Sequence, residues 1–257
     1  TPQILDLANH VISANTGRMG KTLRATHRSG EVVTVVRSLD ERDEADFVVS
    51  EMMTRRSSHS LSLDDMAVLY RTNAQSRALE EALRRQAIPY RLVGAVRFYD
   101  RREIRDLMAY LKLIANPADD EAFRRAVAVP KRGLGETTIE MLAEASRMHG
   151  VPMLEGAQNP EIVSTLRSAA RVALAEFVRL ILELRELATE AAVDELLQEL
   201  VDRVRYGDYL RAEGPESAER LDNVRELMTG AAEVVADELG EVGLRPLDHF
   251  LQRASLV

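Results

Sequence analysis

The sequence predicts an α/β region followed by an all-helical region. Before residue 116, short segments rich in β-branched residues alternate three times with amphipathic helical segments, which is the pattern of a parallel sheet. After Pro117 no convincing strand follows, and helical segments continue to the end of the sequence. We therefore expect a partial parallel sheet with its helices, a boundary at about 116–118, and then a helical domain.

The first region is expected to begin with a helix at 1–15, where apolar residues recur at helical spacing behind Pro2. The β-branched run EVVTVVRSL then predicts a strand. The helix after it opens with acids and closes with arginines, as the helix dipole favours, and a later helix begins at Asn73, a suitable cap. The predicted strands are 31–39, 65–72 and 88–96, and the helices that follow them are 40–56, 73–86 and 100–116.

In the second region, glycine, proline and asparagine interrupt the helical periodicity at VPKRGLG, HGVP, QNP, YGDY and EGPES. No internal repeat or low-complexity tract accompanies these breaks. The helices expected between them are 119–129, 136–149, 160–189, 191–204, 216–238 and a short one at 246–255.

The composition excludes several function classes. The 257-residue chain has no cysteine, so disulfides and thiolate chemistry are excluded, and its five histidines are too scattered to suggest a metal site. The sequence holds no run of 18 apolar residues and no charged-then-apolar leader, so we expect a cytoplasmic protein with no membrane partner. No pairing of nucleophile and base emerges either, and the acid pairs Glu80-Glu81 and Asp119-Asp120 are interpreted as solvated faces or helix caps.

The net charge of −8 is unevenly distributed. Residues 1–115 hold 18 Lys and Arg against 15 Asp and Glu, whereas residues 116–257 hold 16 against 27. Within the first region, residues 71–112 carry ten basic and five acidic side chains. A polyanion would therefore be attracted to that stretch and not to the protein as a whole.

Arg71, Thr72 and Asn73 end the second predicted strand and begin the next helix, at the edge of a parallel sheet where ligands bind. Arginine can hold a phosphate with two hydrogen bonds and asparagine can bond a backbone or base edge, so a nucleic-acid strand could cross here. The alternative is that Asn73 only caps the helix and Arg71 lies in solvent. In the nearby stretch GAVRFYDRREIRD, arginines flank Phe98 and Tyr99, which fits either base stacking or a core phenylalanine beside a solvated helix start.

Residues 127–142, VAVPKRGLGETTIEML, place two glycines behind a Lys-Arg pair and run into a predicted helix. Gly133 and Gly135 permit a tight turn, Thr137 or Thr138 can cap the helix, and the N–H groups at the helix start carry partial positive charge. A nucleotide P-loop is excluded at this turn, because GxxxxGK[ST] is absent and the lysine precedes the glycines. The turn is either a grip on a DNA backbone or a plain corner between two helices.

Several segments together resemble the UvrD/PcrA/Rep group of superfamily 1 DNA helicases. In chain order they are TPQILDLAN, GRMGKTL, AVLYRTNAQSRALEEAL, IPYRLVGAVRFYDRREIRDLMAYLKLIANPADD, PKRGLG and SAERLDNVRELM. The resemblance implies an internal piece of an ATP-dependent 3′-to-5′ DNA helicase of repair or replication restart. Residues 1–30 would enter the second RecA-like domain, 31–117 would be part of that domain, called 2A, and 118–257 would be its helical insertion, called 2B.

The resemblance also implies where cofactors act. The family's P-loop lysine and Mg²⁺ ligands are expected in a part of the parent that this sequence does not include. ATP and Mg²⁺ would therefore act in the parent, and the isolated piece is expected to bind no cofactor and to hydrolyse no ATP.

Two DNA contacts follow from the same resemblance. Arg71, Thr72 and Asn73 match the family segment that contacts single-stranded DNA. The stretch KRGLGETT matches the glycine turn by which 2B touches the duplex backbone, and it implies contacts from Lys131, Arg132, Gly133, Gly135, Thr137 and Thr138.

The expected partners are single-stranded and duplex DNA at a junction, the remaining RecA-like domains and accessory proteins. A different hypothesis is a regulatory or protein-interaction module with little DNA affinity, motivated by the acidic charge of 116–257. A third hypothesis, an enzyme acting on a small substrate, has no supporting constellation of residues.

Overall fold

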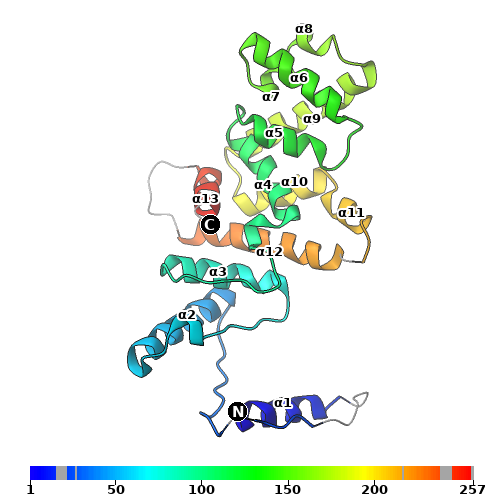
Figure 1. The fold of residues 1–257 in the computed structure, drawn as a ribbon. Coiled ribbons are helices and arrows are strands. Elements are labelled where there is room, and N and C mark those ends of the chain that lie inside the picture. Colours follow the sequence, from blue (N-terminus) through cyan, green and yellow to red (C-terminus); the bar gives the residue numbers. More distant parts are fainter. Residues whose placement is uncertain (16–21, 27, 216, 238–244, 256–257) are drawn as a thin grey trace. The chain divides into compact units, whose positions relative to one another are not determined.

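A computed structural model of the chain describes residues 1–15, 22–26, 28–215, 217–237 and 245–255. The chain divides into two compact units, Thr1–Glu44 and Ala45–Val257. Every regular element in these described ranges is helical (Figure 1). No helix among them is long and apolar enough to cross a membrane.

The predicted partial parallel sheet is wrong, because the described residues contain no strand and the fold is mostly helical instead of α/β. No backbone hydrogen bond joins any of the three predicted strands, 31–39, 65–72 and 88–96, to another. Several of their apolar side chains lie in solvent, with Val35 86% and Leu69 90% exposed, whereas Ile88 is buried against helices. A β-branched run favours extended backbone, but a strand also requires a neighbour that exchanges ladder hydrogen bonds with it. The sequence pattern reports only the first of these requirements.

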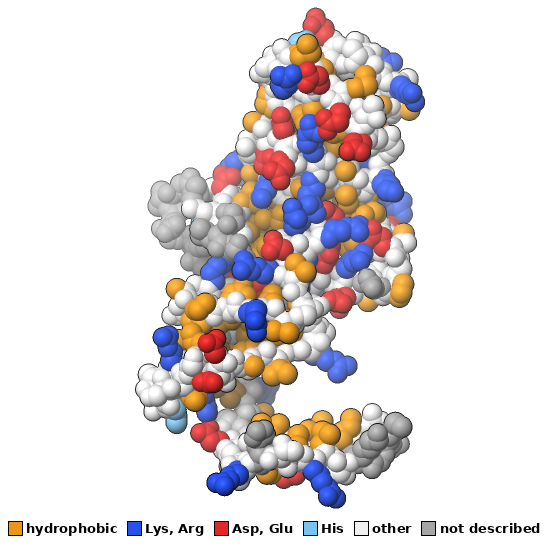
Figure 2. Space-filling view, in the orientation of Figure 1, with side chains coloured by type: hydrophobic (Ala, Val, Ile, Leu, Met, Phe, Trp, Pro, Cys, Tyr) orange, Lys and Arg blue, Asp and Glu red, His pale blue; other side chains and the backbone are white. Residues whose placement is uncertain are grey.

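The first unit contains helix α1, Pro2–Ser13, which confirms the helix predicted at 1–15. Asn9 ties the helix to the segment after it, because its amide donates to the Leu23 carbonyl at 3.0 Å and accepts from the Leu23 N–H at 3.1 Å. The apolar residues of α1 form an exposed row (Figure 2), each at least 41% exposed: Ile4, Leu7, Val11 and Ile12. Residues 17–21, most of the stretch GRMGKTL, lie outside the described residues.

Helix α2 begins in the first unit and continues into the second, which holds all later elements. The elements from α2 to α5 are α2 Glu41–His59, the 3-10 helices η1 Leu63–Asp65 and η2 Asn73–Gln75, α3 Ser76–Arg85, the 3-10 helix η3 Phe98–Asp100, α4 Arg102–Ala115 and α5 Asp120–Ala128. The later ones are α6 Glu136–His149, α7 Met153–Gly156, α8 Pro160–Val163, α9 Ser168–Leu187, α10 Val193–Arg203, α11 Tyr206–Arg211, α12 Ser217–Asp237 and α13 Pro246–Ser255.

All the helices predicted from the sequence are present in these described ranges, within a few residues at each end. The segment predicted as one helix at 160–189 is divided into α8 and α9. Two short helices were not predicted: α7 lies between the breaks HGVP and QNP, and α11 begins within the break YGDY. Local signals explain the boundaries: Asp119 caps α5 by accepting from the Ala122 N–H at 2.8 Å, and Gly150 ends α6 in the left-handed region at φ 68°.

Two hydrophobic clusters stabilise the second unit. The smaller one joins α2 to α3 through Ala45, Val49, Ala78, Ala82, Leu83 and Ile88. The larger one is centred on α4, whose Ile104, Leu107, Tyr110, Leu111 and Leu113 are fully buried. Helices α5 and α9 pack on α4, and α12 and α13 also contact it, so residues distant in sequence meet around one helix (Figure 1).

Buried ion pairs join α3 to α12 and α13. Arg77 of α3 is 1% exposed and contacts Glu81 at 3.2 Å, Glu226 at 2.6 Å and Glu233 at 2.8 Å, while Arg253 of α13 contacts Glu81 at 2.8 Å. We call these five residues the Arg77 cluster. Burial alone would raise the pKa of Glu81, but Arg77 and Arg253 hold it below its ordinary value.

The environment of the Glu80-Glu81 pair corrects its interpretation as a solvated face. Both carboxylates are about 5% exposed or less. Glu80 accepts hydrogen bonds from Ser76 Oγ at 2.7 Å, Tyr90 Oη at 3.0 Å and the Phe98 N–H at 3.3 Å. A buried carboxylate is tolerated only with such partners, so these acids hold the fold together.

Candidate nucleic-acid interface

The glycine turn lies in the loop 129–135, between α5 and α6. Gly133 adopts φ 74°, the left-handed region that favours glycine, so the chain can reverse there. Leu134 packs its side chain against the main hydrophobic core and anchors the turn. Gly135 is the N-cap of α6, with φ −77° and ψ 160°. The loop is thus fixed at its middle and leads directly into a helix start.

Several backbone N–H groups near the start of α6 have no hydrogen-bond acceptor among the described residues. The N–H groups of Thr138 and Ile139 bond to the Gly135 carbonyl at 2.9 and 3.2 Å. Within the part of the chain that the structure describes, the N–H groups of residues 133–137 have no hydrogen-bond acceptor. The prediction that Thr137 or Thr138 caps α6 is wrong: the helix begins at Glu136, so both threonines lie inside its first turn and no side chain makes a cap bond.

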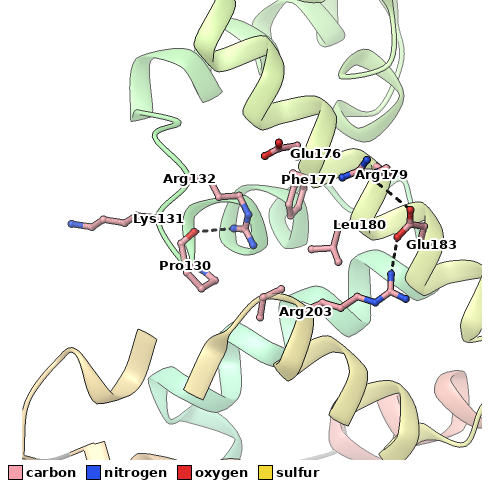
Figure 3. Close-up of a pocket in the computed structure, with 10 residues that line it drawn as sticks. Pro130, Lys131, Arg132, Glu176, Phe177, Arg179, Leu180, Glu183 and Arg203 are labelled. Atoms are coloured by element: carbon pink, nitrogen blue, oxygen red, sulfur yellow. Dashed lines mark hydrogen bonds and ion pairs between the residues drawn. The ribbon is translucent and has the colours of Figure 1, made fainter. Parts of the chain in front are cut away.

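The two basic residues of the turn differ in environment (Figure 3). Lys131 is exposed and extends away from the helical body, and its ammonium group has no partner among the described residues. Arg132 points inward: its Nη1 donates to the carbonyls of Ala126 and Val127 at 3.2 Å each and of Pro130 at 2.9 Å. Lys131 is therefore available to an external anion, whereas the donors of Arg132 are engaged inside the protein.

Aromatic side chains complete the environment of Arg132. Its guanidinium carbon lies 5.1 Å from the Phe177 ring centroid and 5.7 Å from that of Tyr110, within cation–π range. Arg132 Nη2 also donates to Tyr110 Oη, which itself donates to the Val129 carbonyl at 2.6 Å. Burial raises the pKa of Tyr110 to about 12, against the opposing effect of Arg132, so the hydroxyl stays protonated at neutral pH.

A hollow of about 410 Å³ lies beside this loop, and α9 and α10 form its other walls (Figure 3). Two of its cations are paired: Arg203 contacts Glu183 at 2.7 Å and Glu199 at 2.6 Å, and Arg179 contacts Glu183 at 3.9 Å. The other two lining cations are Lys131 and Arg132 of the loop itself. The groups of the loop that attract an anion and have no partner among the described residues are therefore Lys131 and the N–H groups of residues 133–137.

The three residues predicted to contact single-stranded DNA lie at the start of η2, beside α12 and not at a sheet edge. The Gln75 side chain accepts from the N–H groups of Arg71 and Thr72 at 3.0 Å each and so fixes this turn. The Asn73 amide donates to Glu219 of α12. The guanidinium of Arg71 is exposed and has no partner among the described residues. Arg71 is thus accessible, whereas Asn73 is held by a carboxylate.

Of the two interpretations of the stretch 94–106, the core one is confirmed for Phe98. This side chain is 1% exposed, and the Arg101 guanidinium lies 5.1 Å from its centroid. Arg101 is itself buried and donates to Asn223 Oδ1 at 2.9 Å and Ser76 Oγ at 2.7 Å. Because Phe98 has no free face, it is not available for stacking on a base.

Sequence reasoning missed the residues that surround the candidate sites. Tyr110 and Phe177 lie against Arg132, and Glu219 accepts from Asn73, but each belongs to another helix and is at least 22 residues away in the sequence. Their periodic positions indicate only that they lie on helices, so no local signal identifies them. Among the described residues, no group of three or more His, Cys, Asp or Glu could hold a metal ion.

Comparison with known proteins identifies the family to which this chain belongs. The ATP-dependent DNA helicase PcrA of Bacillus subtilis is 37% identical over 230 residues, which cover 89% of this chain and 31% of that protein. DNA helicase II of Escherichia coli is 38% identical over 261 residues, covering 100% of this chain and 35% of the relative. The ATP-dependent DNA helicase UvrD1 of Mycobacterium tuberculosis is 37% identical over 272 residues, with the same coverages.

The chain therefore spans about a third of the length of these relatives. The family model of the UvrD-like helicase C-terminal domain matches residues 1–257, the whole chain. This match and the identities show that the chain belongs to the UvrD-like helicase C-terminal domain family.

Proposed function

We propose that this chain is the DNA-binding portion of an ATP-dependent 3′-to-5′ DNA helicase that acts in the cytoplasm in DNA repair or replication. In this proposal the start of η2 contacts single-stranded DNA, and the loop 129–135 with the start of α6 contacts the duplex backbone. Residues 1–30 lead into domain 2A, 31–117 belong to 2A, and 118–257 belong to 2B. The similar proteins named as DNA helicases support this proposal.

The environment of Gly135 is the observation that carries the duplex contact. Its φ of −77° is accessible to any residue, and a Cβ built on it meets no atom within 4 Å. Neither backbone conformation nor internal packing therefore requires glycine at this position. A glycine that leaves open space beside unpaired N–H groups is suited to the close approach of another molecule's backbone.

The donors at the turn match the chemistry of phosphate. The backbone N–H groups of residues 133–137, the partial positive charge of the α6 start and the ammonium of Lys131 are the donors and charges that this loop offers to a phosphate group. The exposed Thr137 hydroxyl and the partly exposed Thr138 hydroxyl can add donors. None of these groups reads a base edge, so the contact would be independent of sequence.

For single-stranded DNA, the proposed contacts are Arg71, Thr72 and Asn73. The exposed Arg71 guanidinium can bind a phosphate bidentately, and Asn73 would exchange its contact with Glu219 for one to the strand. These residues lie in the stretch 71–112, where basic side chains outnumber acidic ones. The local charge therefore favours a polyanion there.

ATP hydrolysis is assigned to the parent helicase, together with Mg²⁺ and the remaining RecA-like domains. The chain alone is expected to bind neither cofactor and to show no DNA-stimulated ATPase activity, because phosphoryl transfer needs the P-loop lysine and Mg²⁺ ligands of the parent. A coupled ATPase assay with and without single-stranded DNA tests this expectation, and any DNA-stimulated hydrolysis by the pure chain would contradict it.

A regulatory or protein-interaction module is the second candidate function. The acidic charge of 116–257 favours it, and in Figure 2 acidic and basic side chains are intermixed over the helical body instead of forming a continuous basic surface. In that case an accessory protein would bind the acidic helices, and DNA affinity would be small.

Matched charge removals distinguish the two functions. We would measure the affinity of the chain for a blunt duplex and for a single strand by fluorescence anisotropy over a series of salt concentrations. Lys131→Ala is expected to lower duplex affinity and to reduce the salt slope by about 0.9, the value of one lost phosphate contact. Lys112→Ala, which removes an equally exposed lysine from α4, is the control.

For the single strand, Arg71→Ala is expected to reduce the salt slope by about 0.7, with Arg171→Ala on α9 as the exposed control. If the variants at residues 131 and 71 both bind DNA as the wild-type chain does, the DNA contacts are wrong and the interaction module is favoured.

A further inference from the structure

We infer that Arg132 is a positioning residue for the duplex contact and not itself a phosphate ligand. It holds the loop 129–135 in the conformation that presents the backbone N–H groups of the turn. The inference rests on the proposed duplex contact, and it assigns different roles to two neighbouring basic residues. Lys131 would bind the DNA backbone directly. Arg132 would hold the turn, whose N–H groups also bind the DNA backbone.

The hydrogen bonds of Arg132 join the end of a helix to the loop. Ala126 and Val127 lie in the last turn of α5, where carbonyl groups lack helical partners, and Pro130 lies in the loop itself. One guanidinium nitrogen donates to all three carbonyls, so the loop is held against the end of α5. The positive charge is also favourable at a helix C-terminus.

The surroundings of the guanidinium leave little room for a phosphate. Phe177 and Tyr110 lie against it, with ring centroids 5.1 and 5.7 Å away, and the side chain points into the body in Figure 3. A phosphate could bind Arg132 only by displacing carbonyl partners and moving it off the rings. Lys131 requires no such rearrangement, because it already lies in solvent.

Tyr110 extends the same arrangement into the core. Its side chain is fully buried, yet its hydroxyl accepts from Arg132 and donates to the Val129 carbonyl at 2.6 Å. A single buried hydroxyl thus connects Arg132 with the first residue of the loop. Removing it changes no charge and touches no surface, so an effect on DNA binding would have to act through the position of the loop.

Three variants separate positioning from direct contact: Arg132→Ala, Arg132→Lys and Tyr110→Phe. If Arg132 binds a phosphate, lysine should largely rescue the affinity lost in the alanine variant, since it keeps the charge. If Arg132 positions the loop, lysine should not rescue it, because an ammonium group cannot replace the planar fork that donates to several carbonyls and stacks on rings.

We expect Arg132→Lys and Arg132→Ala to lower duplex affinity by about tenfold, the equivalent of two or three ordinary hydrogen bonds. Tyr110→Phe is expected to lower duplex affinity by about threefold, the equivalent of one such bond. Single-strand affinity should stay unchanged in all three variants, which a general loss of folding would not permit. In the DNA-free chain, the backbone amide NMR order parameters of residues 131–137 should fall in these variants and not in Lys131→Ala.

Wild-type duplex affinity in Arg132→Lys would overturn the inference, as would unchanged loop order parameters in Tyr110→Phe. Because Tyr110→Phe is conservative, it keeps the test decisive if the Arg132 variants fail to fold, which circular dichroism would show. Lower loop order parameters with unchanged duplex affinity would overturn the positioning role alone. Failure of the proposed function has a different signature, namely a Lys131→Ala variant that binds duplex DNA as tightly as the wild type.

Discussion

Replacing Gly135 by serine tests the duplex contact most directly, because the structure predicts opposite effects on stability and on binding. At φ −77° a serine is unstrained, and its side chain would extend into open space. Serine is also a better helix N-cap than glycine, so the Gly135→Ser variant should be as stable as the wild type or a few tenths of a kcal/mol more stable. Folding alone therefore gives no reason for this variant to lose function.

Duplex binding should weaken in the same variant. The added Cβ and hydroxyl would occupy the space through which a phosphate approaches the N–H groups of residues 133–137, and the hydroxyl could itself accept from the helix N–H groups. Loss of one hydrogen bond to a charged oxygen costs about 1.5–3 kcal/mol, so we expect affinity to fall at least tenfold.

The measurements are duplex affinity by fluorescence anisotropy and the free energy of unfolding by urea denaturation. Gly133→Ala is the matched comparison: its φ of 74° makes a side chain unfavourable by about 1–2 kcal/mol, although space is open there too. Gly133→Ala should lower the free energy of unfolding as well as place a methyl group at the proposed contact, whereas Gly135→Ser should weaken binding without a loss of stability. A Gly135→Ser variant that binds duplex DNA normally would refute the proposed approach of the backbone.

Three further predictions concern charge. Glu136→Gln should raise duplex affinity about threefold, because it removes an exposed negative charge from the first turn of α6, beside the proposed contact. Repulsion between two unit charges roughly 7 Å apart in water amounts to about 0.6 kcal/mol, and an unchanged anisotropy titration would count against this site. Glu219→Ala should strengthen single-strand binding by a similar factor, because it removes a negative charge and the acceptor that holds Asn73; no gain would argue against Asn73 as a contact. Arg77→Met should lower the free energy of unfolding by about 3 kcal/mol at neutral pH, because the buried Glu81 and the partly buried Glu226 and Glu233 lose this cation, while Arg253 still contacts Glu81. Because the pKa of Glu81 is lowered from its ordinary value of 4.5, ionised Glu81 stabilises the wild type fully above pH 4.5, and this contribution is lost as the pH falls through the lowered pKa. The Arg77→Met variant should therefore lose less stability on acidification than the wild type. Urea denaturation at several pH values measures this difference.

Helices could be predicted from the sequence because their signals are local. Asp119 caps α5 and Gly150 terminates α6, as short-range rules favour, and the predicted and observed ends of these helices agree closely. The strands could not be predicted in the same way. The runs around Val35 and Leu69 have the right composition, but strand formation depends on a hydrogen-bonding partner that the runs themselves do not specify.

In the candidate site, too, short-range features could be predicted from the sequence, and contacts between residues distant in sequence could not. The turn at Gly133 and the start of α6 follow from the sequence, since glycine and helix signals are short-range. The different roles of Lys131 and Arg132 do not, because adjacent basic residues look equivalent in the sequence. What separates them is an aromatic environment contributed by α4 and α9, with Tyr110 lying 22 residues before Arg132.

The Arg77 cluster has a consequence for the order in which the chain can become native during synthesis. The partners Glu226 and Glu233 follow Arg77 by 149 and 156 residues. At a translation rate of about 5–20 residues per second, α3 is complete for roughly 8–30 s before α12 has been synthesised. During that interval Arg77 has only Glu81 beside it, so burying its charge against α12 must wait, whereas α4 and α5 can already pack together. A shortened version of the protein that ends before α12 would lack Glu226 and Glu233, so the charge of Arg77 could not be buried against that helix.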